Sequence, residues 1–85
     1  METRVAVISI IVEKNEVTEQ LNAVLHDYAE YIIGRMGIPY RSKNINIISI
    51  AVDAPQDVIS SLSGKIGKLY GVSVKTAYSS VIFQE

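Results

Sequence analysis

Two short runs of apolar residues dominate the pattern of the chain. Residues 5–12 and 45–52 consist of valine, isoleucine, alanine and serine with a single asparagine, and neither run contains a charged side chain. β-branched residues in runs of this length favour strands over helices. We therefore predict one β-strand in each run.

A helical pattern follows the first predicted strand. Val17, Leu21, Leu25 and Tyr28 recur at intervals of three or four residues, which places them on one face of a helix. Asn15 precedes this pattern, and its side-chain oxygen can accept hydrogen bonds from the first free amides of the helix. We predict that Asn15 caps the helix.

Residues 32–40 carry apolar side chains on alternate positions, a period that predicts another strand. Gly34, Gly37 and Pro39 weaken pairing in the middle of a sheet, so this strand is predicted to lie at an edge. Residues 41–44 are polar and predict a hairpin loop that leads into the second apolar run.

A second helix and a fourth strand complete the pattern. Asp53 and Pro55 are typical of the start of a helix. The apolar stripe of this helix comprises Val58, Leu62, Ile66 and Leu69. Gly71 is expected to end it, residues 72–78 alternate as a last strand, and residues 79–85 are expected to form a tail.

The order strand, helix, strand, strand, helix, strand matches the split βαβ plan, an α+β ferredoxin-like fold. In this βαββαβ plan, a four-stranded antiparallel sheet carries two helices on one face, and the first and third strands lie in its centre. The two most apolar predicted strands are the first and the third, as the plan requires. With 85 residues and no linker-like segment, the chain is expected to form one domain over residues 1–85.

Both sides of the two central strands are apolar, whereas a sheet covered on one face should alternate apolar and polar residues. The even-numbered residues carry more bulk, so we assign them to the helices. The opposite surface is then formed by Val5, Val7, Ile11, Ile45 and Ile47. We predict that it is buried in a homo-oligomer, a dimer or tetramer, or against a partner protein. The alternative is that long side chains or the C-terminal tail cover it within one subunit.

The composition excludes several kinds of site. The chain contains no cysteine and one histidine, which rules out a disulfide framework, a thiolate nucleophile and a self-contained transition-metal site. We therefore expect no metal and no cofactor. Ser60, Ser61 and Ser63 have no neighbouring base, and Asp53 and Asp57 are placed to cap a helix, so we expect no enzymatic activity.

Charge and hydropathy bear on partners and location. Eight Lys and Arg residues against nine Asp and Glu residues give a net charge of -1 without a basic block, so no direct nucleic-acid binding is expected. The longest apolar run is far shorter than a membrane-spanning helix, and the first residues lack the features of a signal peptide. We expect a cytoplasmic protein that does not bind membranes.

Residues 34–41, Gly-Arg-Met-Gly-Ile-Pro-Tyr-Arg, form the most specific tract of the chain, and residues 47–50, 53–55 and 62–65 add to the pattern. In these tracts the chain resembles a family of small bacterial regulators of the iron-only hydrogenase system. The resemblance implies an ACT-like domain that shares its ferredoxin-like fold with the C-terminal domain of nickel-responsive regulators. Those repressors bind nickel through histidines and a cysteine of the sheet and carry a separate DNA-binding domain. This chain has no cysteine, no histidine in a predicted strand and no residues left for a second domain.

Four residues are candidates for a ligand site. Arg35 lies between two glycines of the edge strand, where its guanidinium can bind a carboxylate or phosphate of an effector. It can equally be a solvated charge that discourages strand pairing. The same two interpretations apply to Tyr40 and Arg41 beside the hairpin loop, where the solvated one is favoured. Asn15 fits the position at which ACT-like domains place an Asp or Asn near their ligand, although this turn lacks their glycine.

These observations favour a non-catalytic, ACT-like regulatory module, which the resemblance assigns to the iron-only hydrogenase system. It would bind a small effector or a partner protein as a homo-oligomer. One alternative is a nickel-responsive-type metal sensor or transcriptional regulator that lacks its own DNA-binding domain. That sensor would use His26, which lies off the apolar stripe and is expected to be exposed, together with carboxylates across an interface. Another alternative is a structural oligomerisation module without a ligand.

Overall fold

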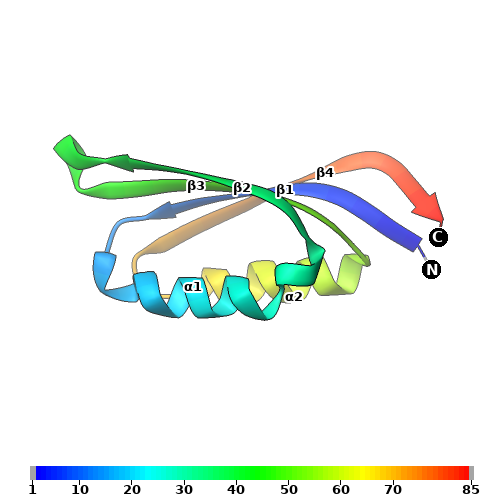
Figure 1. The fold of residues 1–85 in the computed structure, drawn as a ribbon, viewed down its shortest axis with the longest axis horizontal. Helices are drawn as coiled ribbons and strands as arrows, with labels where there is room; N and C mark the ends of the chain where they lie inside the picture. The colour runs from blue at the N-terminus through cyan, green and yellow to red at the C-terminus, as the bar shows by residue number, and fades with distance from the viewer. Residues whose placement is uncertain (1, 85) are drawn as a thin grey trace.

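The computed structural model describes residues 2–84, which form four strands and two α-helices in the predicted order. They are β1 (Glu2–Val12), α1 (Thr18–Asp27), β2 (Ile32–Tyr40), β3 (Ile45–Ala54), α2 (Gln56–Gly67) and β4 (Val72–Gln84). Short 3-10 turns precede α1, β2 and β3. They span Asn15–Val17, Ala29–Tyr31 and Arg41–Lys43. Both helices lie on one side of the sheet, and residues 2–84 place no helix or strand on its other side (Figure 1). The predicted α+β ferredoxin-like fold is confirmed.

The sheet has the order β2-β3-β1-β4, and all neighbouring strands are antiparallel. The two apolar runs therefore occupy its centre, and the strand that contains Pro39 lies at an edge, as predicted. In the central pair, Ile8 lies opposite Ile50 and Ser9 lies opposite Ser49. This register places residues of the same parity on the same face of the sheet.

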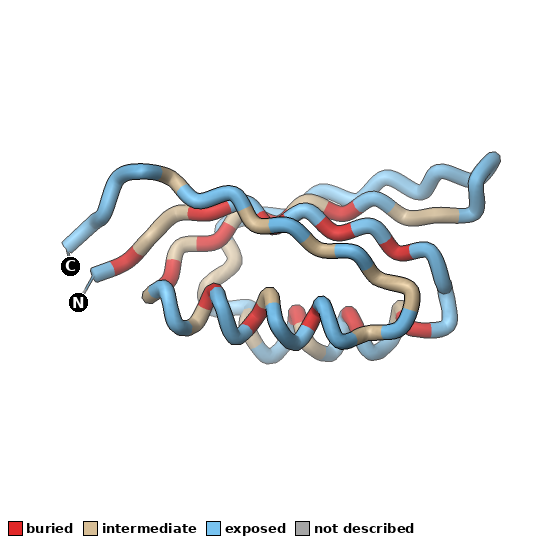
Figure 2. The backbone as a smooth tube through the Cα atoms, turned by 180° about the vertical axis from the view of Figure 1, so that it is seen from behind, coloured by how far each residue is buried: buried red, intermediate tan, exposed pale blue. Residues whose placement is uncertain are grey.

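The core lies between the sheet and the two helices. From Ala6 to Val12 in β1 and from Ile48 to Ala54 in β3, the even-numbered residues are buried, and buried positions alternate with more exposed ones along the central strands (Figure 2). Ile8, Ile10 and Ile50 are fully buried. The helices contribute Leu21, Leu25, Ile59, Leu62 and Ile66 to the core. The assignment of even-numbered residues to the helix side is confirmed.

The predicted helix caps are wrong at both helices. Asn15 opens a 3-10 turn, its side chain makes no capping hydrogen bond, and α1 begins only at Thr18. Asp53 lies within β3, because β1 extends far enough to pair Val5 with Asp53, and α2 begins at Gln56 directly after Pro55. In both cases strand pairing and loop contacts override the local preference of the residue for a cap.

The expected C-terminal tail is also wrong for residues 79–84, which continue β4. After an irregularity in the register, Arg4 of β1 lies opposite Ile82. The Arg4 guanidinium contacts β4 beside this irregularity: Nη2 donates a 2.7 Å hydrogen bond to the Ser79 carbonyl oxygen, and Cζ lies 5.0 Å from the centroid of the Tyr78 ring. The end of β4 accordingly runs beside the start of β1 (Figure 1).

Two residues with positive φ close the connections at one end of the sheet. Asn44 ends the turn between β2 and β3 with φ 55°, and Gly71 leads into β4 with φ 72°. The Gly71 carbonyl oxygen accepts a 2.8 Å hydrogen bond from the Glu13 amide, which ties this connection to the end of β1. Over residues 2–84, neither helix is long and apolar enough to cross a membrane.

Candidate functional site

A cleft of about 280 Å³ separates strand β2 from helix α1. β2 contributes Arg35, Gly37 and Pro39, which alternate along the strand and lie opposite Ile50, Ile48 and Asn46 of β3. Since Ile48 and Ile50 are buried on the helix side of the sheet, these β2 residues face α1. The spacing of two residues in a strand therefore lines up one polar side chain, one glycine and one proline along the cleft.

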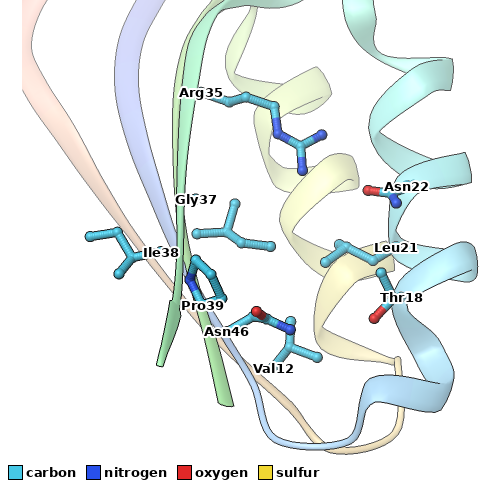
Figure 3. Close-up of a pocket in the computed structure, with 10 residues that line it drawn as sticks. Val12, Thr18, Leu21, Asn22, Arg35, Gly37, Ile38, Pro39 and Asn46 are labelled. Atoms are coloured by element: carbon cyan, nitrogen blue, oxygen red, sulfur yellow. The ribbon is translucent and has the colours of Figure 1, made fainter. Parts of the chain in front are cut away.

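The walls of this cleft are apolar and its rim is polar. Val12, Leu21 and Ile48 form the inner wall. Thr18 and Asn22 of α1 border the cleft from the opposite side. Arg35 projects from β2 into the space between β2 and α1 (Figure 3). A Cβ added to Gly37 would meet nothing within 4 Å, so the glycine leaves open space on the β2 side.

Arg35 is exposed, and within residues 2–84 its guanidinium makes no hydrogen bond and no ion pair. The Arg35 side chain also borders a neighbouring hollow between β2 and α1, whose lining includes His26 and Asn22. A guanidinium presents five donors in a fixed plane and suits carboxylate or phosphate groups. The cleft can therefore bind a small anion with an apolar portion.

A second cavity of about 280 Å³ adjoins the cleft at the end of the β2–β3 hairpin. It shares Pro39 and Asn46 with the cleft. Three amide side chains meet there: Asn15 Nδ2 donates to Asn44 Oδ1 at 3.1 Å, and Asn46 Nδ2 donates to Asn15 Oδ1 at 3.0 Å. The network leaves the Asn44 amide nitrogen and the Asn46 amide oxygen available to a ligand.

The structure brings the four candidate ligand residues to two neighbouring cavities. Arg35 lines the cleft, whereas Asn15, Tyr40 and Arg41 line the adjoining cavity. The sequence interpretation missed Thr18, Asn22 and Asn46. Asn46 carries a recognisable signal, because it is the one amide side chain within an otherwise apolar run. Thr18 and Asn22 carry none, since only the fold places α1 opposite β2.

A separate polar group lies on the outer surface of the helices. Tyr28 Oη lies 2.8 Å from Ser61 Oγ, and Lys65 Nζ lies 5.0 Å from the centroid of the Tyr28 ring. The contact with Lys65 lowers the pKa of the Tyr28 hydroxyl below its ordinary value, and the same contact raises the pKa of Lys65. These groups border an open hollow of about 470 Å³ between the end of α1 and α2, whose lining also includes Asp27, Glu30 and Asp57. Ser61 and Lys65 are exposed to solvent, and we assign this hollow no chemistry.

The positions of His26 and the acidic residues bear on the metal alternative. His26 is exposed on α1, as expected. No three His, Asp or Glu side chains of residues 2–84 are grouped so that they could hold a metal ion.

The predicted interface residues lie together on the helix-free face of the sheet. Val7, Ile11 and Ile47 are 40%, 41% and 39% exposed, and Val5 and Ile45 are half-buried. β2 extends this face with Met36 and Ile38, which lie opposite Ser49 and Ile47 and which the sequence interpretation did not assign to it.

The chain resembles a number of solved structures, among them the following two. The uncharacterized protein TM1266 from Thermotoga maritima is 36% identical with a TM-score of 0.86, and the match covers 89% of this chain and 96% of that one. A formyltetrahydrofolate deformylase from Pseudomonas putida KT2440 is 11% identical with a TM-score of 0.63, over 86% of this chain and 28% of that one. The second likeness shows the fold alone. No curated protein matches the sequence.

A protein-family model matches residues 4–76, from the first central strand into β4. Its description is "Iron-only hydrogenase system regulator, putative", under the family name TM1266-like. The matched range contains the whole β2–α1 cleft, including Arg35, Gly37 and Pro39. The chain belongs to the TM1266-like family.

Proposed function

We propose that the protein is a non-catalytic regulator in the iron-only hydrogenase system and that it responds to a small anionic effector bound in the β2–α1 cleft. The family description supports the regulatory role. The observation that carries the effector is Arg35, whose guanidinium has no partner within residues 2–84 and points into the cleft. An unpaired cation at an apolar cleft is suited to a ligand that brings its own negative charge.

The size and lining of the cavities restrict the effector. Each cavity is close to the lower limit of about 300 Å³ for small-molecule sites, so one cavity holds only a small ligand. Arg35 borders the first cavity and Arg41 borders the second, while Asn46 lies at their junction. An anionic group beside either arginine and a hydrogen-bonding group near Asn46 would match this lining.

The two alternative functions predict different responses to added ligands. A metal sensor would need His26 and carboxylates from two subunits, and it would respond to a divalent metal and not to an organic anion. A structural oligomerisation module would respond to neither. The three functions can therefore be separated by what raises the thermal stability of the protein.

Thermal unfolding in the presence of small carboxylates, phosphates, nucleotides, amino acids and divalent metals tests the proposal. A ligand that binds only the native state at about 100 times its Kd adds about 2.7 kcal/mol of stability, which raises the midpoint of a domain of this size by roughly 10 °C or more. We expect such a shift with an anionic compound, and we expect Arg35→Ala to abolish it. Lys68→Ala removes an exposed cation of the segment after α2 and should leave the shift unchanged.

A second variant tests the cleft without changing any charge. Gly37→Leu should fill the cleft and abolish the shift while the protein remains folded, because a Cβ at this position meets nothing within 4 Å. Gly64→Leu is the matched control, since Gly64 has equally open surroundings on α2. A full response in Gly37→Leu would place the effector elsewhere. A native protein that responds to no anion would contradict the proposal, and a response to divalent metals alone would favour the sensor.

A further inference from the structure

The helix-free face of the sheet is largely apolar, with a row of serines across its centre and few charges. The register defines three complete rows across β2, β3, β1 and β4. The rows are Gly34, Ala51, Val7 and Ala77; then Met36, Ser49, Ser9 and Lys75; then Ile38, Ile47, Ile11 and Ser73. Lys75 is the one charged residue in these rows, and it lies on the edge strand β4.

The dimensions of this face match those of a protein interface. Four strands about 4.8 Å apart and about ten residues long, at about 3.3 Å per residue, give an area on the order of 600 Å². Standard interfaces bury about 800 Å² of accessible surface on each partner, whereas apolar patches of several hundred Å² on a monomer usually mark a binding site. The face is therefore large enough to form an interface with the same face of a second copy of the chain.

The two edges of the face have complementary shapes. On β2, Met36 and Ile38 project with 61% and 51% of their surface exposed. On the opposite edge, β4 presents Ser73 and Ala77, and a hollow of about 120 Å³ opens beside Ser73. The β2 edge is therefore raised, whereas the β4 edge is recessed at Ser73 and Ala77, with the exposed side chain of Lys75 between them.

We propose that two copies of the chain pack these faces together around a two-fold axis parallel to the strands, so that β2 of each copy lies over β4 of the other. This arrangement seats Ile38 over Ser73 and its hollow in the partner copy and places Met36 over the aliphatic stem of Lys75, whose ammonium group can reach solvent at the edge of the sheet. It also keeps Lys75 away from its own symmetry mate. Ser9 and Ser49 share one row and come opposite each other between the two copies, where their hydroxyl groups can form hydrogen bonds. Aligned packing of two sheets about 10 Å apart is a common architecture.

The other face-to-face arrangement, with the two-fold axis across the strands, is disfavoured on two grounds. It would place β2 over β2, so that the exposed Met36 and Ile38 side chains of the two copies would collide. It would also place β4 over β4, which brings Lys75 towards Lys75 and faces one hollow with another. Like charges in contact and unfilled space both weaken an interface. The inference concerns the face opposite the cleft and does not depend on an effector.

Sedimentation at micromolar concentration tests whether the face is an interface. We expect the native protein to sediment as a dimer, or as a multiple of it, and Ile11→Asp to sediment as a monomer, because Ile11 lies on a central strand of the face. Tyr70→Asp is the control: Tyr70 is 67% exposed, lies outside the sheet and should leave the dimer intact. Circular dichroism would verify folding, and Met36→Asp offers a second disruption at a more exposed position. A monomeric native protein, or Ile11→Asp and Met36→Asp proteins that are folded and still dimeric, would overturn the proposal.

Cross-linking of introduced cysteines tests the orientation, since the chain contains no cysteine of its own. Packed sheets lie about 10 Å apart, which is too far for a disulfide, so the test uses a short bismaleimide that joins two thiols across about 10 Å. Residues 38 and 73 lie on opposite edges of one sheet, about 14 Å apart, which is beyond the reach of this reagent within a subunit. We expect the double variant Ile38→Cys/Ser73→Cys to form a covalent dimer with this reagent and each single variant to remain uncrosslinked. A covalent dimer of the Ile38→Cys protein alone, or none from the double variant, would overturn the β2-over-β4 arrangement.

Discussion

Replacing Ile50 with alanine is expected to lower the free energy of unfolding by about 2–5 kcal/mol. Ile50 is fully buried on the central strand β3, where it lies opposite Ile8 of β1 and Arg35 of β2. Truncation removes apolar contacts and leaves a cavity that the two neighbouring strands and the helices cannot close without shifting. Urea unfolding followed by circular dichroism measures the loss, and a loss below about 1 kcal/mol would contradict the burial of this residue.

Ile47 provides a matched comparison, because it is the same residue type on the same strand but on the opposite face, with 39% of its surface exposed. In a dilute, monomeric sample, Ile47→Ala should cost less than half of what Ile50→Ala costs. If the face is an interface, the cost at Ile47 should increase with protein concentration, because association stabilises only the native chain. The cost at Ile50 should change much less with concentration. Equal losses for the two variants at every concentration would contradict the assignment of the faces.

The hydrophobic pattern was sufficient to predict the centre of the fold. Period-two alternation placed Ile8 and Ile10 on one side and Val7 and Ile11 on the other, and the structure confirms this division. The reason is physical: a strand turns successive side chains to opposite faces, so the bulkier set identifies the covered side without any knowledge of the helices.

The ends of elements were less predictable because long-range pairing decides them. Asp53 has a strong local preference for a helix cap, yet the partner strand β1 keeps it in β3. The segment from Ser79 onward was expected to be a tail that follows the alternating residues 72–78. It continues β4 because Ile82, Phe83 and Gln84 pair with the start of β1, and Arg4, 75 residues earlier, also donates a hydrogen bond to the Ser79 carbonyl oxygen. No window of local sequence contains that contact.

The candidate site was predictable on its strand side only. Arg35 attracted attention because a large cation lies between two glycines, and the structure places it in the cleft with an unpartnered guanidinium. Strand β2 then turns alternate residues to two surfaces: Arg35 and Gly37 face the cleft, whereas Met36 and Ile38 face away from the helices. Because neighbouring residues serve different surfaces, the effector proposal and the interface proposal can be tested by separate single substitutions.

Gly71→Ala should destabilise the protein by about 2–5 kcal/mol, the largest effect expected of any single methyl group added to a glycine of this chain. Gly71 has φ 72°, a conformation that costs a residue with a Cβ about 1–2 kcal/mol. A Cβ there would also lie 2.7 Å from Lys14 Cβ and 3.3 Å from the Lys14 amide nitrogen. Forced overpacking of this kind adds about 1–3 kcal/mol.

The connection cannot relieve this contact by moving away, because the Gly71 carbonyl oxygen accepts the 2.8 Å hydrogen bond from the Glu13 amide at the end of β1. The matched control is Gly64→Ala in α2, where a Cβ meets nothing within 4 Å and alanine should add about 0.5–1 kcal/mol of stability through its higher helix propensity. Unfolding curves of the two variants should therefore shift in opposite directions from that of the native protein. An unchanged midpoint for Gly71→Ala would show that the left-handed conformation at this position is not required, and that Lys14 and Glu13 can move together without loss of the core.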